Sequence, residues 1–225
     1  MTNIQAQCDL FFSGYAEGSS NNKFLEIYNP TSADISLEGF ALANVSNAPT
    51  TPGVYEYWNL FPEGAVVAAG DVFFILHGSA SDPVIIAEAD WLHTYGDTGT
   101  GLSNGDDGYA LVQGDESNYV IVDMIGTWDA DPGSGWEVAG VSNGTQNHSL
   151  IRKSDVNSGN SGAWAASAGT DATDSEWIVL DQDDWTGVGS HDFTGSCGPI
   201  VPGCMNENAS NYDAAATSDD GSCAF

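Results

Sequence analysis

The apolar residues of this chain come in short runs, and this pattern restricts it to a β fold. Residues that favour strands dominate the runs, and Gly, Asn, Asp, Ser and Pro separate them, as is typical of strands joined by turns. No stretch of a dozen residues has the 3.6-residue periodicity of an amphipathic helix. We predict nine strands, at residues 9–12, 23–28, 40–45, 55–60, 72–77, 109–113, 119–125, 148–152 and 176–180.

The faces of these strands indicate two packed sheets. Residues 72–76 and 120–122 are apolar on both faces, which suits central strands, whereas Glu26 and Asp123 each put a carboxylate on one face of a strand. A two-layer sandwich accommodates both patterns. We therefore expect an all-β chain built on a β-sandwich, with a hairpin turn at residues 104–108 (NGDDG).

The composition changes after residue 193, which divides the chain. Residues 194–202 contain two Gly, two Pro and a Cys and read as a linker, so that residues 8–193 are the sandwich domain and residues 203–225 a second, small unit. Residues 1–7 read like the end of a secretory signal peptide, and we predict that they are its remnant.

Four cysteines lie near the two ends of the chain: Cys8, Cys197, Cys204 and Cys223. The tail is too short for a hydrophobic core, and a disulfide between Cys204 and Cys223 would close about 20 residues and stabilise it by roughly 3 kcal/mol. By elimination Cys8 would pair with Cys197, although four cysteines allow three pairings. Paired cysteines are typical of an oxidising compartment, so we expect a secreted or cell-surface protein.

The charge of the chain excludes several classes of partner. There are 32 acidic residues against 3 basic ones, a formal net charge of −29. Affinity for nucleic acids comes mainly from Lys and Arg that neutralise phosphates, so we expect no nucleic-acid partner. No apolar run approaches the roughly 20 residues of a membrane-spanning helix, so we expect no membrane insertion. The natural partners of such a surface are cations.

Five segments of the sandwich region carry a family likeness. They are residues 18–30 (GSSNNKFLEIYNP), 102–112 (LSNGDDGYALV), 122–136 (VDMIGTWDADPGSGW), 148–159 (HSLIRKSDVNSG) and 175–193 (SEWIVLDQDDWTGVGSHDF). In order, they resemble the bacterial lamin-tail domain family over roughly residues 8–193. The resemblance implies an immunoglobulin-like β-sandwich that serves as an accessory module of secreted or surface proteins, and it brings no catalytic residues.

The tail carries a second likeness. Residues 203–223 have a GC start, an A-x-N-Y-D middle and a DDGSC end. This pattern is similar to a short repeat common in marine bacterial surface proteins, where it is often tandem. The single copy here suggests a fragment of a longer polypeptide or a compact member of that group.

Oxygen-bearing side chains predict a calcium site in the tail, because Ca²⁺ takes six to eight oxygen ligands in flexible geometry. The candidate ligands are Asn206, Asn208, Asp213, Asp219 and Asp220, with Asn211 close by. The alternative is that these residues only form turns and Asx caps in a disulfide-stapled knot. Their spacing does not match an EF-hand loop.

Two further acidic clusters lie beside tryptophans. Their members are Asp181, Asp183 and Asp184 near Trp177 and Trp185, with Asp171 and Asp174 close by, and Asp129 and Asp131 beside Trp128. These clusters predict either another cation site, a stacking platform for a sugar, or simply a solvated acidic loop. A carbohydrate-binding module that uses Trp128, Trp136 or Trp185 is therefore the alternative function.

Few motifs in the chain indicate catalysis. Residues 159–162 read GNSG, but the G-x-S-x-G pattern is missing and no positioned base is evident for the serine. No H-E-x-x-H, P-loop or C-x-x-C motif is present. Paired carboxylates of a glycoside hydrolase are a minor alternative, because such pairing is spatial.

The three basic residues are informative because they are so few. We predict that Arg152 and Lys153 meet a carboxylate of the same domain, with Arg152 the better bidentate donor, and a phosphate site is the alternative. Lys23 lies at the start of a strand, and we predict that it is solvated.

We therefore predict a non-enzymatic, secreted or cell-surface protein with a structural or adhesive role: an immunoglobulin-like sandwich followed by a disulfide-stapled tail that binds Ca²⁺. Its expected partners are other copies of the chain, in an extracellular assembly or filament, or extracellular matrix and surface proteins. Glycans are the partners that the carbohydrate-binding alternative implies.

Overall fold

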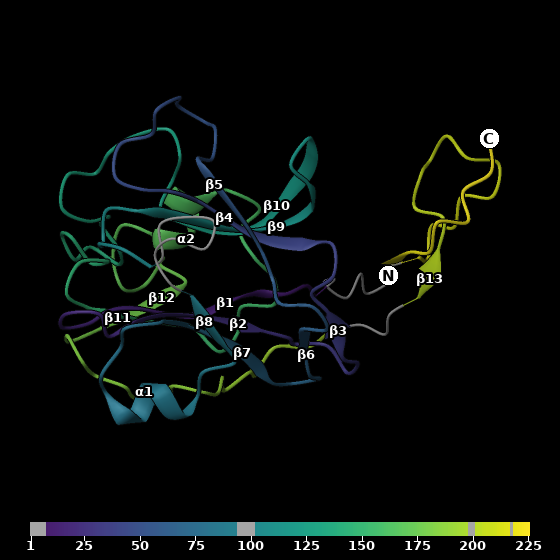
Figure 1. The fold of residues 1–225 in the computed structure, drawn as a ribbon. Helices are drawn as coiled ribbons and strands as arrows, with labels where there is room; N and C mark the ends of the chain where they lie inside the picture. The colour runs from purple at the N-terminus through teal and green to yellow at the C-terminus, as the bar shows by residue number, and fades with distance from the viewer. Residues whose placement is uncertain (1–7, 94–101, 198–200, 217) are drawn as a thin grey trace. The chain divides into compact units, whose positions relative to one another are not determined.

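The computed structural model describes residues 8–93, 102–197, 201–216 and 218–225 (Figure 1). The chain forms two compact units, of which the larger is Asp9–Gly195 and the smaller contains Cys8 and Ser196–Phe225. Within the described residues, no helix has the length and the apolar character that crossing a membrane requires.

The larger unit contains a six-stranded sheet in the order β12–β11–β1–β2–β7–β8, with antiparallel neighbours except for the parallel pair β7 and β8. Its strands are β1 (Phe11–Glu17), β2 (Lys23–Tyr28), β7 (Val72–His77), β8 (Trp91–His93), β11 (Ser149–Arg152) and β12 (Trp177–Leu180). The central strands β1 and β2 are buried along their whole length, so both faces of this sheet are covered.

A second, four-stranded antiparallel sheet has the order β10–β9–β4–β5. Its strands are β4 (Phe40–Val45), β5 (Tyr57–Leu60), β9 (Gly108–Asp115) and β10 (Asn118–Ile125), and the short strands β3 (Ile35–Ser36) and β6 (Val66–Val67) pair separately. The two sheets enclose one apolar core, in which Leu25 and Ile27 lie in the same cluster as Leu42 and Leu111. The prediction of an all-β sandwich is confirmed.

The outer face of the six-stranded sheet is covered by a short helix and a long loop. Helix α1 (Pro83–Ala87) lies on the side away from the four-stranded sheet (Figure 1), and its Ile85 packs with Phe24 and Phe74. Residues 181–193, here called the strap, add Trp185 and Val188 to the same apolar cluster. The second helix, α2 (Trp164–Ala168), buries Trp164 in the main core.

Strand positions follow the sequence pattern closely, and the exceptions have local causes. The predictions for 23–28, 40–45 and 72–77 coincide with β2, β4 and β7. The strand predicted at 9–12 instead runs from Phe11 to Glu17, because a bulge between Phe12 and Gly14 lets the chain continue past two small residues.

The hairpin predicted at residues 104–108 is wrong. That segment is a turn that leads into β9, and the tight hairpin of this sheet instead lies where Asp115 pairs with Asn118 between β9 and β10. Asp107, expected in the turn, is buried, and its carboxylate accepts a hydrogen bond from the Tyr109 hydroxyl (2.8 Å). The side chain of Asp107 is therefore part of the interior.

The smaller unit is held by disulfides. Cys204 is bonded to Cys223, and Cys8 to Cys197, which is the pairing reached by elimination. Strand β13 (Pro202–Gly203) runs parallel to β14 (Ser218–Asp219). In the chain-entropy account, closing the 189-residue separation between Cys8 and Cys197 destabilises the unfolded chain by about 5 kcal/mol.

Candidate functional sites

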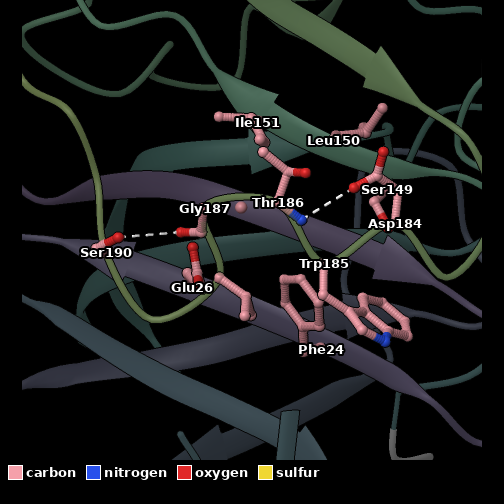
Figure 2. A pocket seen from close by; sticks show the side chains of 12 residues that line it. Phe24, Glu26, Ser149, Leu150, Ile151, Asp184, Trp185, Thr186, Gly187 and Ser190 are labelled. Atoms are coloured by element: carbon pink, nitrogen blue, oxygen red, sulfur yellow. Dashed lines mark hydrogen bonds between the residues drawn. The ribbon is translucent and has the colours of Figure 1, made fainter. Parts of the chain in front are cut away.

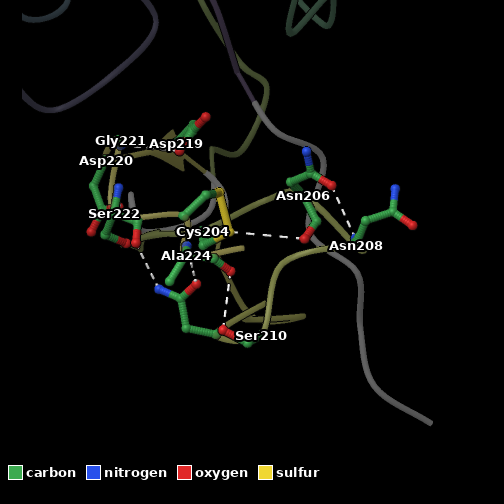
Figure 3. The surroundings of a disulfide bond; sticks show 11 residues. Cys204, Asn206, Asn208, Ser210, Asp219, Asp220, Gly221, Ser222 and Ala224 are labelled. Atoms are coloured by element: carbon green, nitrogen blue, oxygen red, sulfur yellow. Dashed lines mark hydrogen bonds between the residues drawn. A yellow bond between two sulfur atoms is a disulfide. The ribbon is translucent and has the colours of Figure 1, made fainter.

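The predicted calcium ligands of the tail form a set of tight turns (Figure 3). Oδ1 of Asn206, Asp213, Asp219 and Asp220 each accepts a hydrogen bond from the backbone N–H two residues further on, at 2.9–3.0 Å. Within the described residues, no three His, Cys, Asp or Glu side chains are grouped to hold a metal ion. These side chains thus have the turn-forming role of the alternative interpretation, and metal binding by them stays a prediction.

The backbone nitrogens or strand register of Asp213, Asp219 and Asp220 nevertheless place these three residues along one segment, Gly203–Cys204. Asp213 N donates to Cys204 O (2.9 Å), and Asp220 N donates to Gly203 O (3.3 Å). Asp219 pairs with Gly203 in the β13–β14 ladder. Each of these carboxylates uses one oxygen in its turn, so the second oxygen is the atom that a cation would approach. Asn208 is exposed and lies in the turn that Asn206 caps.

The acidic cluster at residues 181–184 fastens the strap to the sandwich. Oδ1 of Asp183 accepts a hydrogen bond from Ser19 N (2.8 Å), and Trp185 lies over Phe24 while its Nε1 donates to Asp82 Oδ2 (3.0 Å). Trp177 is 1 % exposed. The pair Trp177 and Trp185 is therefore not an exposed sugar platform.

Beneath the strap, Glu26 is a carboxyl group buried against glycines (Figure 2). Its Oε1 accepts a hydrogen bond from Gly189 N (2.6 Å), and a Cβ added to Gly14 would lie 2.5 Å from its Oε2. Only glycine at position 14 leaves room for this side chain. A cavity of about 10 Å³ adjoins it, close to the smallest volume that holds a water molecule. Burial raises the pKa of Glu26 to about 8, so the group is mostly protonated at neutral pH.

A buried ion pair joins the two sheets. Asp123 on β10 and Arg152 on β11 both have fully buried side chains, with Oδ2 and Nη1 3.1 Å apart. The same Oδ2 accepts a hydrogen bond from Phe12 N (2.8 Å) at the bulge of β1. A bulge in β10 between Ile121 and Asp123 interrupts the ladder beside the carboxylate, as bulges do where a side chain is re-aimed.

Most of the other polar atoms of this pair are also used, although Arg152 Nε has no hydrogen-bond partner among the described residues. Asp123 Oδ1 accepts hydrogen bonds from Met124 N and Asn160 N, both at 2.9 Å, and Arg152 Nη2 donates to Glu176 Oε2 (2.8 Å). The guanidinium carbon lies 4.6 Å from the Trp177 ring. The predicted carboxylate partner of Arg152 is confirmed, and this enclosed guanidinium is not placed to bind a phosphate.

The other two basic residues differ from the prediction. Lys153 Nζ donates to the carbonyls of Ala172 (2.9 Å) and Thr173 (3.4 Å), not to a carboxylate. Lys23 is buried and forms an ion pair with Glu17 (3.3 Å), so the prediction that it is solvated is wrong. Glu17 escapes sequence analysis because it becomes the cross-strand neighbour of Lys23 only when β1 extends past its bulge.

Two of the three tryptophans expected to bind sugars, Trp128 and Trp136, lie in the interior, whereas Trp185 is partly buried. Trp128 is 3 % and Trp136 9 % exposed, and their Nε1 atoms donate to the carbonyls of Gly108 (3.1 Å) and Asp107 (2.9 Å). Partly buried aromatic rings surround Trp128 on the outer face of the four-stranded sheet, with Tyr55 and Tyr119 at centroid distances of 6.0 and 6.5 Å. Alternating apolar residues predict the strands but not which rings stay accessible.

An open groove lies beside α2. Its volume is about 720 Å³, and exposed Ala163, Ala165 and Ala166 form part of its lining together with the carboxylates of Asp129 and Glu137. No sequence motif marks it, since its lining combines residues from separate segments of the chain, many of them small. The GNSG segment nearby is a turn packed on β10, where Ser161 N donates to Val122 O (3.1 Å).

Comparison with known proteins identifies a family for the first part of the chain. A family model described as Lamin Tail Domain matches residues 3–128, more than half of the 225 residues and a span that includes β1 to β10. No curated protein matches the chain. The two disulfides indicate an oxidising compartment.

Proposed function

We propose that this chain, which belongs to the lamin tail domain family of immunoglobulin-like β-sandwiches, is a non-enzymatic structural module of the extracellular space or cell surface. The observation that carries the proposal is the structural use of its buried polar side chains. Asp123 and Arg152 tie one sheet to the other, and Glu26 anchors the strap. These groups are enclosed, and their hydrogen bonds hold separate elements of the fold together, as in a framework built for rigidity.

The location is part of the proposal. Both disulfides suit a secreted protein, because thiols stay reduced in most cytosols. The likeness of residues 203–223 to a repeat of bacterial surface proteins supports the same location. We propose that residues 8–193 act as the sandwich module and residues 203–225 as a stapled appendage, joined by residues 194–202.

Charge indicates how such a module would associate. Arg152 is fully buried, and Lys23 is 9 % exposed at its side chain, so that Lys153 is the only Lys or Arg of the sequence with an exposed setting. The surface is therefore almost wholly anionic. Two such surfaces repel one another unless cations lie between them, so we propose that Ca²⁺ links copies of the chain or links the chain to other acidic surface proteins.

Calcium should drive association of the full chain. In sedimentation velocity, we expect the weight-average sedimentation coefficient to rise in millimolar CaCl₂ relative to NaCl of equal ionic strength, and to fall again with chelator. If Ca²⁺ binds only the folded tail, calorimetry should also show a higher unfolding temperature, since 100 Kd of free ligand contributes about 2.7 kcal/mol.

The double variant Asp219→Asn/Asp220→Asn tests whether the tail is the site. Asparagine keeps each turn-forming acceptor and removes the charge, so the tail should keep its fold and lose its calcium response. Asp34→Asn is the control, because Asp34 also accepts a backbone hydrogen bond, from Ala69 N, at an exposed position of the sandwich. A sedimentation coefficient that is equal in calcium and sodium would contradict calcium-linked association.

Carbohydrate binding is the second candidate, and the groove beside α2 is the observation that favours it. Asp129 and Glu137 lie in its lining as hydrogen-bond acceptors for hydroxyl groups. Glycan-array binding that disappears in Asp129→Ala/Glu137→Ala would favour this candidate over a purely structural module. Replacing Trp128 or Trp136 would instead disturb the core.

A further inference from the structure

The turn end of the β1–β2 hairpin places a lysine between a carboxylate and a carboxamide. Lys23 Nζ lies 3.3 Å from Glu17 Oε1 and 3.3 Å from Asn104 Oδ1. Glu17 and Lys23 are directly opposite one another in the hairpin, with side chains 11 % and 9 % exposed. An amine and an acid that are both largely buried thus meet an amide carbonyl at the edge of the solvent.

The loop that carries Asn104 is held in place from several sides. Ser103 N donates to the Tyr109 hydroxyl (2.9 Å), and Ser103 O accepts from Lys23 Nζ (2.6 Å). Gly105 O accepts from Thr145 Oγ1 (2.6 Å), and a Cβ at Gly105 would lie 2.6 Å from the Thr145 carbonyl oxygen. Glycine is therefore needed at position 105, and the loop is fixed with Asn104 against Lys23.

We propose that Lys23 and Asn104 become joined by an amide bond between their side chains, with Glu17 as the catalytic residue that transfers the proton. A carbonyl bond is about 1.2 Å long, so Cγ of Asn104 lies at most about 4.5 Å from Nζ. A small rotation of the Asn104 side chain brings these atoms to reacting distance. Holding two groups this close replaces an encounter in solution by a unimolecular step.

The reaction needs no oxidant and no co-reactant. Glu17 takes one proton from the Lys23 ammonium, and the free electron pair of Nζ attacks Cγ of Asn104. The new Nζ–Cγ bond forms as the Cγ–Nδ2 bond breaks, and Glu17 and Nζ return protons to the leaving nitrogen. The products are a side-chain amide and one ammonium ion, with Glu17 again a carboxylate. Asn104 is exposed, so ammonium can escape to solvent.

Such a bond would fasten the two sheets covalently. Lys23 begins β2 of the six-stranded sheet, and Asn104 lies in the loop that enters β9 of the four-stranded sheet. The bond would lie within Asp9–Gly195 and add a cross-link that reduction does not break. It is independent of calcium and of any assembly of the chain.

Mass spectrometry of the full chain tests the proposal. After purification and reduction of the disulfides, the intact mass should be lower than the sequence mass by one ammonia, and proteolysis should release a peptide that joins Lys23 to Asn104. Glu17→Gln and Asn104→Ala should restore the full sequence mass. An unmodified mass in the folded wild-type protein would overturn the proposal.

Asn104 precedes Gly105, and Asn–Gly pairs also lose ammonia by forming a succinimide with their own backbone. Two controls separate the reactions. Hydroxylamine cleaves a succinimide but not a side-chain amide, so cleavage after Asn104 without a joined peptide would overturn the proposal. Asn143→Asp changes the other exposed Asn–Gly pair, Asn143–Gly144, and should keep the deficit of one ammonia.

The joined peptide identifies both partners directly, so the decision does not depend on Lys23→Met. If Lys23→Met folds, by circular dichroism, it should have the full sequence mass. If it still lacks one ammonia, the proposed bond is contradicted.

Discussion

Asp123→Ala should lower the free energy of unfolding by about 3–5 kcal/mol, as removal of one partner from a buried ion pair does. The substitution leaves the Arg152 guanidinium enclosed without the carboxylate that lies 3.1 Å away. It also removes the acceptor of three backbone N–H groups, those of Phe12, Met124 and Asn160. Urea unfolding at pH 7 is the suitable measurement, since an ionic denaturant would screen the net charge of −29.

The matched control is Glu176→Gln, which changes the second carboxylate bonded to the same arginine. The Glu176 side chain is 37 % exposed, so water replaces much of its interaction with Arg152. We expect this substitution to lower the free energy of unfolding by only about 0–1 kcal/mol. If Asp123→Ala and Glu176→Gln lowered the free energy of unfolding by the same amount, the role of Asp123 as the link between the sheets would be contradicted.

Glu26→Gln should stabilise the protein at alkaline pH and flatten its pH profile. The pKa of Glu26 is raised by burial from 4.5 to about 8 in the folded state. Between those values the folded form binds one more proton than the unfolded form, so the unfolding free energy of the wild type falls as pH rises. Protonated Glu26 makes its full contribution to the unfolding free energy below about pH 4.5, and this contribution is lost as the pH rises through about 8. The unfolding free energy falls by about 3–5 kcal/mol in total, at about 1.4 kcal/mol for each pH unit between the two pKa values.

Glutamine is neutral at every pH and keeps the acceptor for Gly189 N. The variant and the wild type should therefore be similar at pH 5 and differ most near pH 9. Burial also lowers the pKa of His191 to about 4 and raises that of Asp107 to about 6. Both groups are present in both proteins, so their effects cancel when urea unfolding of the wild type and of Glu26→Gln is compared at each pH. The remaining difference reports on Glu26. Glu63→Gln, an exposed change at a residue that does not shift the pKa of Glu26, is the control that should keep the wild-type slope. Parallel profiles for Glu26→Gln and wild type would refute a protonated buried Glu26.

Several features of the fold follow from local pattern. Strands β2, β4 and β7 are apolar runs bounded by turn residues, and their limits agree with prediction. A lone carboxylate on an otherwise apolar strand, as at Asp123, and a scarce arginine predict each other, because a buried charge needs a partner. The sequence predicts a carboxylate partner for Arg152 without naming it, and the structure shows that this partner is Asp123.

Other features depend on contacts between distant segments. The environment of Lys23 is set by Ser103 and Asn104, which lie 80 and 81 residues away in the sequence. A pattern of neighbouring residues does not predict contacts over such a separation. The accessibility of Trp128 depends on the rings that pack around it from β5, β10 and the loop before β5. The turns of the tail show a third limit of prediction from sequence. Asn and Asp favour turns and bind cations through the same oxygen atoms, so their pattern does not distinguish the two roles.

The central claim is that this protein is a covalently braced module of an oxidising, extracellular setting, and the state of its thiols tests that claim most directly. Protein recovered from the surface or medium of its source cells should be alkylated in denaturant without reductant and then weighed. We predict no alkylated cysteine, and four after reduction. Four alkylated cysteines before any reductant is added would contradict the account.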